Sequence, residues 1–112
     1  MEDSILTSIK KLIGMTEDYD VFDIDIVMHI NSVFMILYQM GVGPSKPFSI
    51  TDKDDVWTDF LPKDDDNFNA VQTYVYLKTK IVFDPPSNSI IMLANKDMIS
   101  ELEWRLNVNA ES

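Results

Sequence analysis

The stretch FDIDIVMHINSVFMILYQMGVGP, residues 22–44, decides the fold of this 112-residue chain. From Ile24 to Met40 most residues are apolar or tyrosine, so the apolar surface of a helix over this range covers most of its circumference. A helix of this kind lies at the centre of a domain or is buried against a second chain. We therefore predict a central helix here.

The ends of this helix are marked by sequence signals. Asp23 is the predicted N-cap, and Phe22 and Val27 then occupy the N′ and N4 positions of a hydrophobic staple. Gly41 suits the left-handed position that follows a helix, and the GVGP sequence that it begins prevents continuation. The predicted central helix thus covers residues 24–40.

Three other segments show apolar residues at helical spacing and carry their own start and stop signals. Asp3 or Ser4 caps the first of them and Gly14 ends it, whereas DPP at 84–86 ends the second. The predicted ranges are residues 5–13, 66–83 and 90–107. The predicted inner face of the last helix consists of Ile91, Met98, Leu102 and Leu106.

Together these segments predict a single all-α domain over residues 1–112, a small bundle of four main helices. The connection between the second and third helices, residues 41–65, is long for a compact domain, and we predict a partly ordered acidic loop with a function. Residues 107–112 are predicted to form a short exposed tail after the last helix.

Composition excludes several classes of protein. The chain has no cysteine, which rules out disulfides, thiolate zinc sites and a catalytic thiol. Its net charge of −10 opposes binding to nucleic acid through phosphates, although such a chain can work close to DNA by repelling it. Residues 24–40 are too short and too polar to span a bilayer, and residues 1–14 lack the order of a secretory signal, so we expect a soluble intracellular protein.

The acidic loop contains the most charged stretch of the chain, DKDDVWTDFLPKDDD at residues 52–66. Counted from Asp52, it has Trp57 in place of the EF-hand glycine and Lys63 in place of the EF-hand glutamate, so the calcium motif fails. The acids lie in one run without a nearby histidine, which disfavours a hydrolytic carboxylate pair. We therefore predict no metal ion, cofactor or catalytic residue. The aspartates of the run are Asp52, Asp54, Asp55, Asp59, Asp64, Asp65 and Asp66.

Trp57 and Phe60 interrupt this acidic run. Their three-residue spacing places them on one side of a helical turn, and large aromatic side chains seldom occur in a polar loop without a packing partner. Two interpretations stay open: the pair fixes the loop to its own domain, or it packs on a neighbouring chain.

Other candidates for chemistry are weak. His29, the only histidine, lies on a mostly apolar helix, where we predict a hydrogen-bonded structural role in the core or at an interface. Ser32 lies one turn away without a base to activate it. The GVGP sequence lacks the spacing of a phosphate-binding loop.

Basic side chains on the third and fourth helices offer a counterpart to the acidic loop. Lys78 and Lys80 form a small patch on the third helix, and Arg105, next to Trp104, adds a cation on the fourth. These cations are either solvated helix faces or docking points for the acidic segments of an adjacent copy. The second alternative describes a head-to-tail interface, which can close into a ring.

Four stretches of the sequence resemble a known family. They are FDIDIVMHINSVFMILYQMGVGP at 22–44, WTDF at 57–60, YVYLKTKIVFDPP at 74–86 and ELEWRLN at 101–107. Their order and spacing resemble the head–tail connector (adaptor) proteins of long-tailed bacteriophages and prophages of Gram-positive bacteria. The resemblance covers about residues 4–110 and rests on packing and capping patterns, with no catalytic signature.

This resemblance implies a structural, non-enzymatic protein of the virion neck that is assembled in the host cytoplasm. Such proteins are helical bundles that form a ring, commonly a dodecamer, beneath the portal protein. The ring extends the DNA channel, joins the portal to the next neck protein (a stopper or tail terminator) and helps to retain the genome. Because a channel should repel DNA phosphates, part of 52–66 or of the acidic stretch 17–25 is expected to face the lumen. The tail at 107–112 is expected to contact the portal.

Two rival functions belong to other classes. A small acidic regulator or inhibitor that mimics the charge of DNA would be a monomer or dimer bound to a basic partner. A metal-dependent hydrolase using the aspartate run would bind a divalent cation tightly. A connector should instead form large rings or assemble on a portal.

Overall fold

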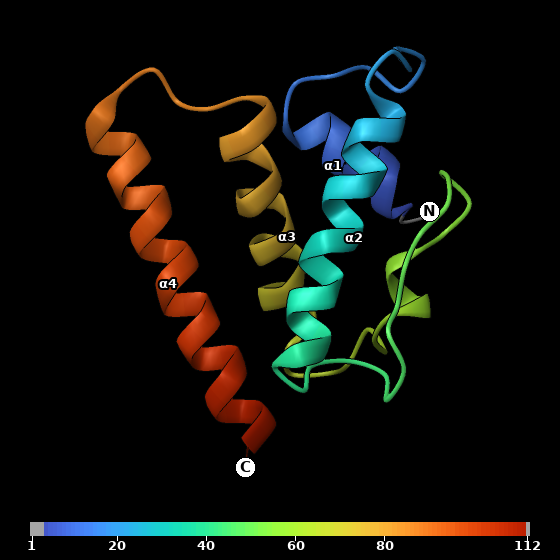
Figure 1. Cartoon of the computed structure of the whole chain (residues 1–112), viewed down its shortest axis with the longest axis vertical. Helices are drawn as coiled ribbons and strands as arrows, with labels where there is room; N and C mark the ends of the chain where they lie inside the picture. The colour runs from blue at the N-terminus through green and yellow to red at the C-terminus, as the bar shows by residue number, and fades with distance from the viewer. Residues whose placement is uncertain (1–3, 112) are drawn as a thin grey trace.

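The computed structural model describes residues 4–111, and in this range it contains four α-helices, one short 3-10 helix and no regular strand. The elements are α1 (Ile5–Leu12), α2 (Asp23–Gln39), η1 (Trp57–Asp59), α3 (Phe68–Phe83) and α4 (Ser89–Glu111). Helix α2 runs through the middle of the molecule, α3 lies beside it, and α4 forms the outer edge next to α3 (Figure 1). The predicted all-α class and the small bundle of four main helices are confirmed.

Helix α2 supplies much of the core, as its apolar sequence predicts. Its buried residues are Ile26, Ile30, Val33, Phe34 and Leu37. The helix nevertheless has more apolar surface than this chain covers, since Ile24, Met28 and Met35 remain 77%, 66% and 43% exposed. Among the helices of residues 4–111, none has both the length and the hydropathy needed to cross a membrane.

The predicted ends of α1 and the C-terminal end of α2 are confirmed. Ser4 caps α1, because its Oγ accepts a hydrogen bond from the Thr7 N–H at 3.2 Å. The alternative cap, Asp3, lies outside the described residues. Gly41 follows the last turn of α2 with φ +84°, a left-handed conformation that glycine adopts without strain.

The predicted N-cap of α2 is wrong. The helix begins at Asp23 itself, with Phe22 as the cap residue and no side-chain cap bond. The Asp23 carboxylate pairs instead with Lys10 of α1, at 2.8 Å between Oδ1 and Nζ. The staple predicted between Phe22 and Val27 depended on that cap and therefore does not apply.

Helix α4 differs from the prediction in its end and its inner face. It continues to Glu111, so that residues 107–110 are exposed helix rather than a separate tail, and residue 112 lies outside the described range. Ile91 and Met98 are 52% and 46% exposed instead of buried. Met98 directly precedes the buried Ile99, so the inner face is rotated from the predicted one, and the start of α4 also lies apart from α3 (Figure 1). The buried apolar residues of α4 are Ile99, Leu102 and Leu106.

The long connection between α2 and α3 follows α2 back toward its first turn and returns through η1 (Figure 1). Asn31 of α2 holds it by pairing with the backbone of Ile50: Nδ2 donates to the carbonyl at 3.0 Å, and Oδ1 accepts from the N–H at 2.7 Å. The Ile5 N–H donates to the Asp55 carbonyl at 3.0 Å, which satisfies a backbone donor that the first turn of α1 leaves unpaired.

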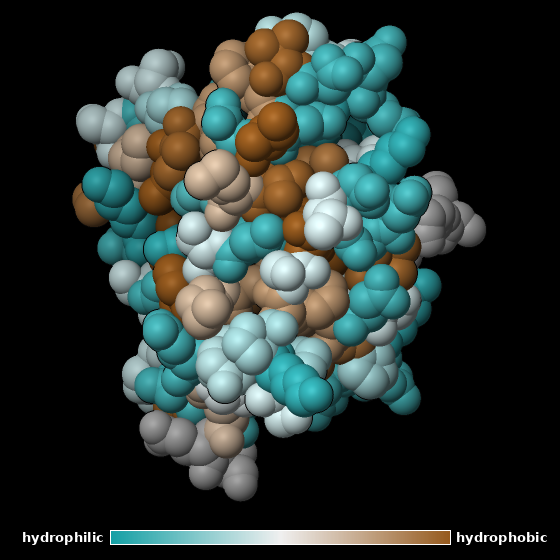
Figure 2. All heavy atoms as spheres, turned by 45° about the vertical axis from the view of Figure 1, so that its right-hand side comes forward, coloured by the Kyte–Doolittle hydropathy of each residue, from teal (hydrophilic) through white to brown (hydrophobic). Residues whose placement is uncertain are grey.

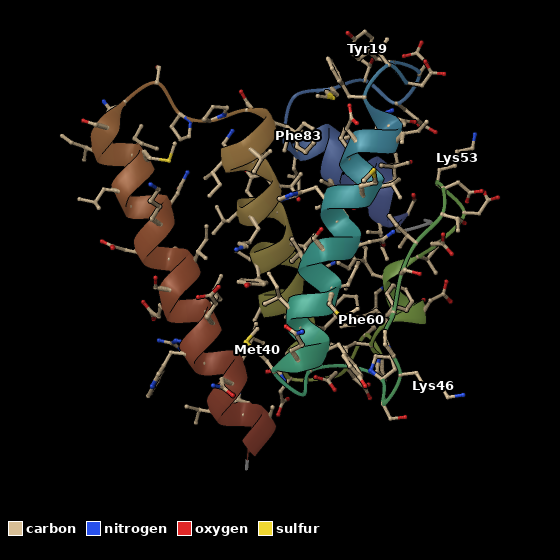
Figure 3. All side chains as sticks on the ribbon, in the orientation of Figure 1. Tyr19, Met40, Lys46, Lys53, Phe60 and Phe83 are labelled. Carbon is tan, nitrogen blue, oxygen red and sulfur yellow. The ribbon has the colours of Figure 1, made fainter. Side chains whose placement is uncertain are left out.

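Trp57 and Phe60 lie in the core of their own chain, where they are 3% and 5% exposed. The Trp57 Nε1–H donates to Ser8 Oγ at 2.9 Å, and the Phe60 ring, which points from the loop toward α2 in Figure 3, lies 4.7 Å from that of Phe34. The pair fixes the loop to its own domain. For the alternative role, a contact to a neighbouring chain, almost none of either side chain is left exposed in this structure.

Replacing Trp57 with alanine should lower the free energy of unfolding by about 3–5 kcal/mol, because the change opens a cavity in the core. Urea unfolding followed by circular dichroism measures the loss. Trp104→Ala is the matched control: that side chain is 67% exposed, and its removal should change the same free energy by less than about 0.5 kcal/mol. Equal losses in the two variants would contradict the core position of Trp57.

Candidate functional site

The cations predicted as docking points each have a partner one turn away along the chain. Such i,i+4 contacts at a surface contribute little free energy, so these side chains stay accessible to a second partner. The hydrogen bond to Asp84 raises the pKa of Lys80. The contacts are Lys80 Nζ to Asp84 Oδ2 at 2.8 Å, Arg105 Nη2 to Glu101 Oε2 at 2.6 Å, and Lys78 Nζ to the Tyr74 ring centroid at 5.9 Å.

His29 and Ser32 have structural partners. His29 Nε2 lies 3.0 Å from the Lys78 carbonyl oxygen, and its ring meets the edge of Phe83 at 5.8 Å, so the residue links α2 to α3. The Ser32 hydroxyl donates to the Met28 carbonyl one turn earlier, at 3.0 Å. Over residues 4–111, no group of three or more histidine, cysteine or acidic side chains is arranged to hold a metal ion.

The seven aspartates of the 52–66 run divide into two groups. Four of them accept hydrogen bonds from nearby backbone N–H groups and so shape the turns of the loop. The other three, Asp54, Asp64 and Asp66, are exposed. The four bonds are Asp52 Oδ1 to Asp54 N at 2.8 Å, Asp55 Oδ2 to Thr51 N at 2.7 Å, Asp59 Oδ2 to Val56 N at 3.2 Å and Asp65 Oδ1 to Asn67 N at 2.8 Å.

The fold brings together two acidic stretches that are distant in the sequence. Residues 17–23, between α1 and α2, and residues 51–54, at the tip of the long loop, line one groove of about 580 Å³ beside the first turns of α2. We call it the acidic groove. Its floor is apolar and consists of Leu6, Ile24, Val27 and Met28. Its rim carries the carboxylates of Glu17, Asp18, Asp20, Asp23, Asp52 and Asp54, together with Lys53 and Thr51.

Lys10 holds the 17–23 side of the acidic groove. This lysine is only 2% exposed, and its Nζ donates to the Glu17 carbonyl at 3.0 Å while pairing with Asp23 at 2.8 Å. Lys10 lies in the last turn of α1, where a cation suits the helix dipole. Its position as a buried tie between α1 and the groove wall was missed.

Asp55 holds the opposite side of the groove. Its Oδ2 accepts hydrogen bonds from the N–H of Thr51 at 2.7 Å, from the Thr51 hydroxyl at 3.2 Å and from the N–H of Asp52 at 3.3 Å. The Thr51 N–H lowers the pKa of the Asp55 carboxyl most, so the group is ionised and the turn is closed at neutral pH. Lys53, at the tip of this turn, projects outward (Figure 3).

Apolar side chains are exposed at the groove and on α4. Figure 2 shows apolar atoms between hydrophilic ones on the face that contains the acidic groove, where Ile24 and Met28 are the most exposed residues of the floor. On α4, Ile90, Ile91 and Leu93 are 76%, 52% and 61% exposed; we call these three residues the α4 face. Neighbouring apolar side chains that are exposed together are typical of protein-binding surfaces.

A comparison with known protein families finds one match to nearly the whole chain: the family model of phage connector proteins covers residues 5–112. The chain belongs to the phage connector family. This confirms the resemblance to head–tail connectors, while the Gram-positive host stays a prediction. No curated protein and no solved structure matches the connector.

Replacing Lys10 of the connector with methionine should lower the free energy of unfolding by about 2 kcal/mol, because Asp23 loses its partner in a site that is only partly hydrated. Urea unfolding measures this change. The neighbouring Lys11 is exposed, so Lys11→Met is the matched control, with a change below about 0.5 kcal/mol. If both variants lost the same small amount, the buried ion pair would not stabilise the groove wall.

Proposed function

We propose that the connector is a non-enzymatic subunit of the phage neck that assembles into a ring beneath the portal protein. In this role it extends the DNA channel and joins the head to the next neck protein. Membership of the phage connector family supports an assembly role over a DNA-mimicking inhibitor. The ring, the portal contact and the channel wall each need a separate surface of the protein.

The observation that carries the ring is the uncovered part of α4. Tyr74 is fully buried and donates a hydrogen bond to Glu103 of α4 at 2.8 Å, which fixes the second half of α4 to α3. Burial and the hydrogen bond to the Glu103 carboxylate raise the pKa of Tyr74 above its usual range. The start of α4 lies apart from α3 at the edge of the bundle (Figure 1), and the three residues of the α4 face are exposed there.

A second copy of the connector is the proposed cover for the α4 face. Burying apolar residues of this size removes a large area from water and favours association. Subunits related by rotation in a ring use two different surfaces on each copy, and the α4 face supplies one of them. Trp104, 67% exposed on the same helix, and the nearby Arg105 extend this surface.

The exposed aspartates at the end of the loop are the proposed channel-facing groups. Asp55 and Asp59 accept backbone hydrogen bonds that shape turns of the loop. Asp64 and Asp66 are exposed, as Asp59 is, and lie at the end of the loop. Carboxylates at a channel wall repel the phosphates of passing DNA and keep it from adhering. The end of α4, residues 107–110, stays a proposed portal contact.

Replacing Leu93 with aspartate should prevent the connector from forming rings, alone or on the portal, because it puts a charge into the apolar contact. Light scattering and native mass spectrometry with purified portal protein measure the assembly. Leu12→Asp is the matched control, since Leu12 is 54% exposed on α1, close to the 61% of Leu93. We expect at least about a tenfold higher concentration for half-assembly with Leu93→Asp and about twofold or less with the control. Equal effects would contradict an α4 interface.

Reversing the charge of Asp64 and Asp66 to lysine should impede DNA passage while leaving the fold intact, because cations at a channel wall attract phosphates. The paired variant Asp64→Asn and Asp66→Asn removes the charge without reversing it and should give a smaller effect. The infectivity of phage carrying each paired variant, with DNA ejection followed over time, measures the size of the two effects. Unchanged infectivity of the lysine pair would exclude these residues from the channel wall.

A further inference from the structure

We infer that the acidic groove docks a basic, amphipathic segment of another protein, whose apolar side chains contact the groove floor while its lysines or arginines meet the carboxylates of the rim. The inference rests on the proposed function in one respect: in the assembled neck, the segment belongs to a neighbouring protein of different sequence. The docking itself requires only a single folded copy of the chain.

The floor of the groove favours a protein ligand. Ile24 and Met28 lie one helical turn apart on α2 and are 77% and 66% exposed, more than the other exposed large apolar side chains of that helix. Leu6 and Val27 close the floor beneath them. A surface that only repelled DNA would have no use for large exposed apolar side chains, whereas an amphipathic segment would cover them.

The rim of the groove selects a basic ligand. Six carboxylates line it, and among the residues of the lining Lys53 is the single cation. Lys10 pairs with Asp23, and within residues 4–111 the other five carboxylates of the rim have no such ion pair. Because Lys10 and Asp55 fix both walls, the site is largely organised before a ligand arrives, which reduces the entropic cost of binding.

A second copy of the chain is a poor occupant. Each copy carries a net charge of −10, so the rim repels most of the surface that a copy could offer. The apolar α4 face has Lys96 nearby, but Asp97 follows it directly and cancels the charge. Lys80 and Arg105 each lie beside an acidic residue one turn away, so the surfaces that carry them have little net positive charge. Charge complementarity therefore favours a partner of opposite sign.

The test uses the full chain and three fluorescein-labelled peptides of about 18 residues. The probe contains leucine and lysine, with leucine at helical spacing. One control has the same composition in an order without an apolar face, and the other replaces lysine with glutamate. Fluorescence anisotropy at physiological salt should show binding of the probe at least about tenfold tighter than that of the reordered peptide, and no binding of the glutamate peptide. Equal affinity for the probe and the reordered peptide would overturn the inference.

Matched variants locate the binding site. The triple variant Asp18→Asn, Asp20→Asn, Asp54→Asn removes three rim charges, and the control Asp64→Asn, Asp66→Asn, Asp97→Asn removes three charges elsewhere. Met28→Gln alters the floor, and Met35→Gln is its control on the same helix outside the groove. Each groove variant should weaken probe binding at least about fivefold, and each control about twofold or less. Equal weakening by both triple variants would mean that net charge alone drives the binding. It would contradict a binding site in the groove.

The outcome for the groove can be separated from that for the ring. Leu93→Asp breaks ring assembly in the proposed function but leaves the groove intact, so it should bind the probe with wild-type affinity. Rings without probe binding would overturn the groove and leave the proposed function standing. Probe binding without rings or portal association would support the groove and overturn the proposed function.

Discussion

The structure depends on a cluster of aromatic rings that attaches the long loop to the central helix. The ring of Phe34 on α2 lies 4.7 Å from Phe60, 5.0 Å from Phe48 and 6.2 Å from Trp57, all three of which belong to the loop. The fit is close: a Cβ at Gly43 would lie 2.5 Å from the Phe60 ring, and its φ of +96° suits glycine. Because the loop is attached here, its tip at 51–54 reaches the first turns of α2 and completes the acidic groove.

The sequence was sufficient to predict the helices, because their apolar residues repeat with the period of a helix and their ends carry glycine or proline. It also indicated the aromatic anchor of the loop, although it left open which chain received it. It did not indicate the acidic groove. The two walls, residues 17–23 and 51–54, come together only because the loop runs back along α2. One signal for Lys10 was present: Leu6, Lys10 and Ile13 follow the i, i+4, i+7 spacing of a buried stripe. A lysine there requires a partner such as Asp23.

The error in α4 has a physical reason. A sequence pattern shows which residues are apolar, but the neighbouring elements decide which of them are covered. Ile99, Leu102 and Leu106 are buried at the i, i+3, i+7 spacing of one helix face, whereas Met98, next to Ile99, lies on another side of the helix and Ile91 lies near its exposed start. An apolar helix that its own chain covers on one side is expected in a subunit of an assembly. Ile91, which contradicts the predicted inner face, thus belongs to the α4 face that supports a role in building a ring.

Charge places opposite demands on the two proposed surfaces. Copies that each carry −10 repel one another, so contact between them has to come from apolar burial on α4, and salt strengthens it by screening the repulsion. The acidic groove attracts a basic segment, and the same screening weakens that attraction. A strongly acidic chain can therefore hold its own copies by hydrophobic contact, bind an unlike partner by charge, and repel DNA with the carboxylates that neither contact covers.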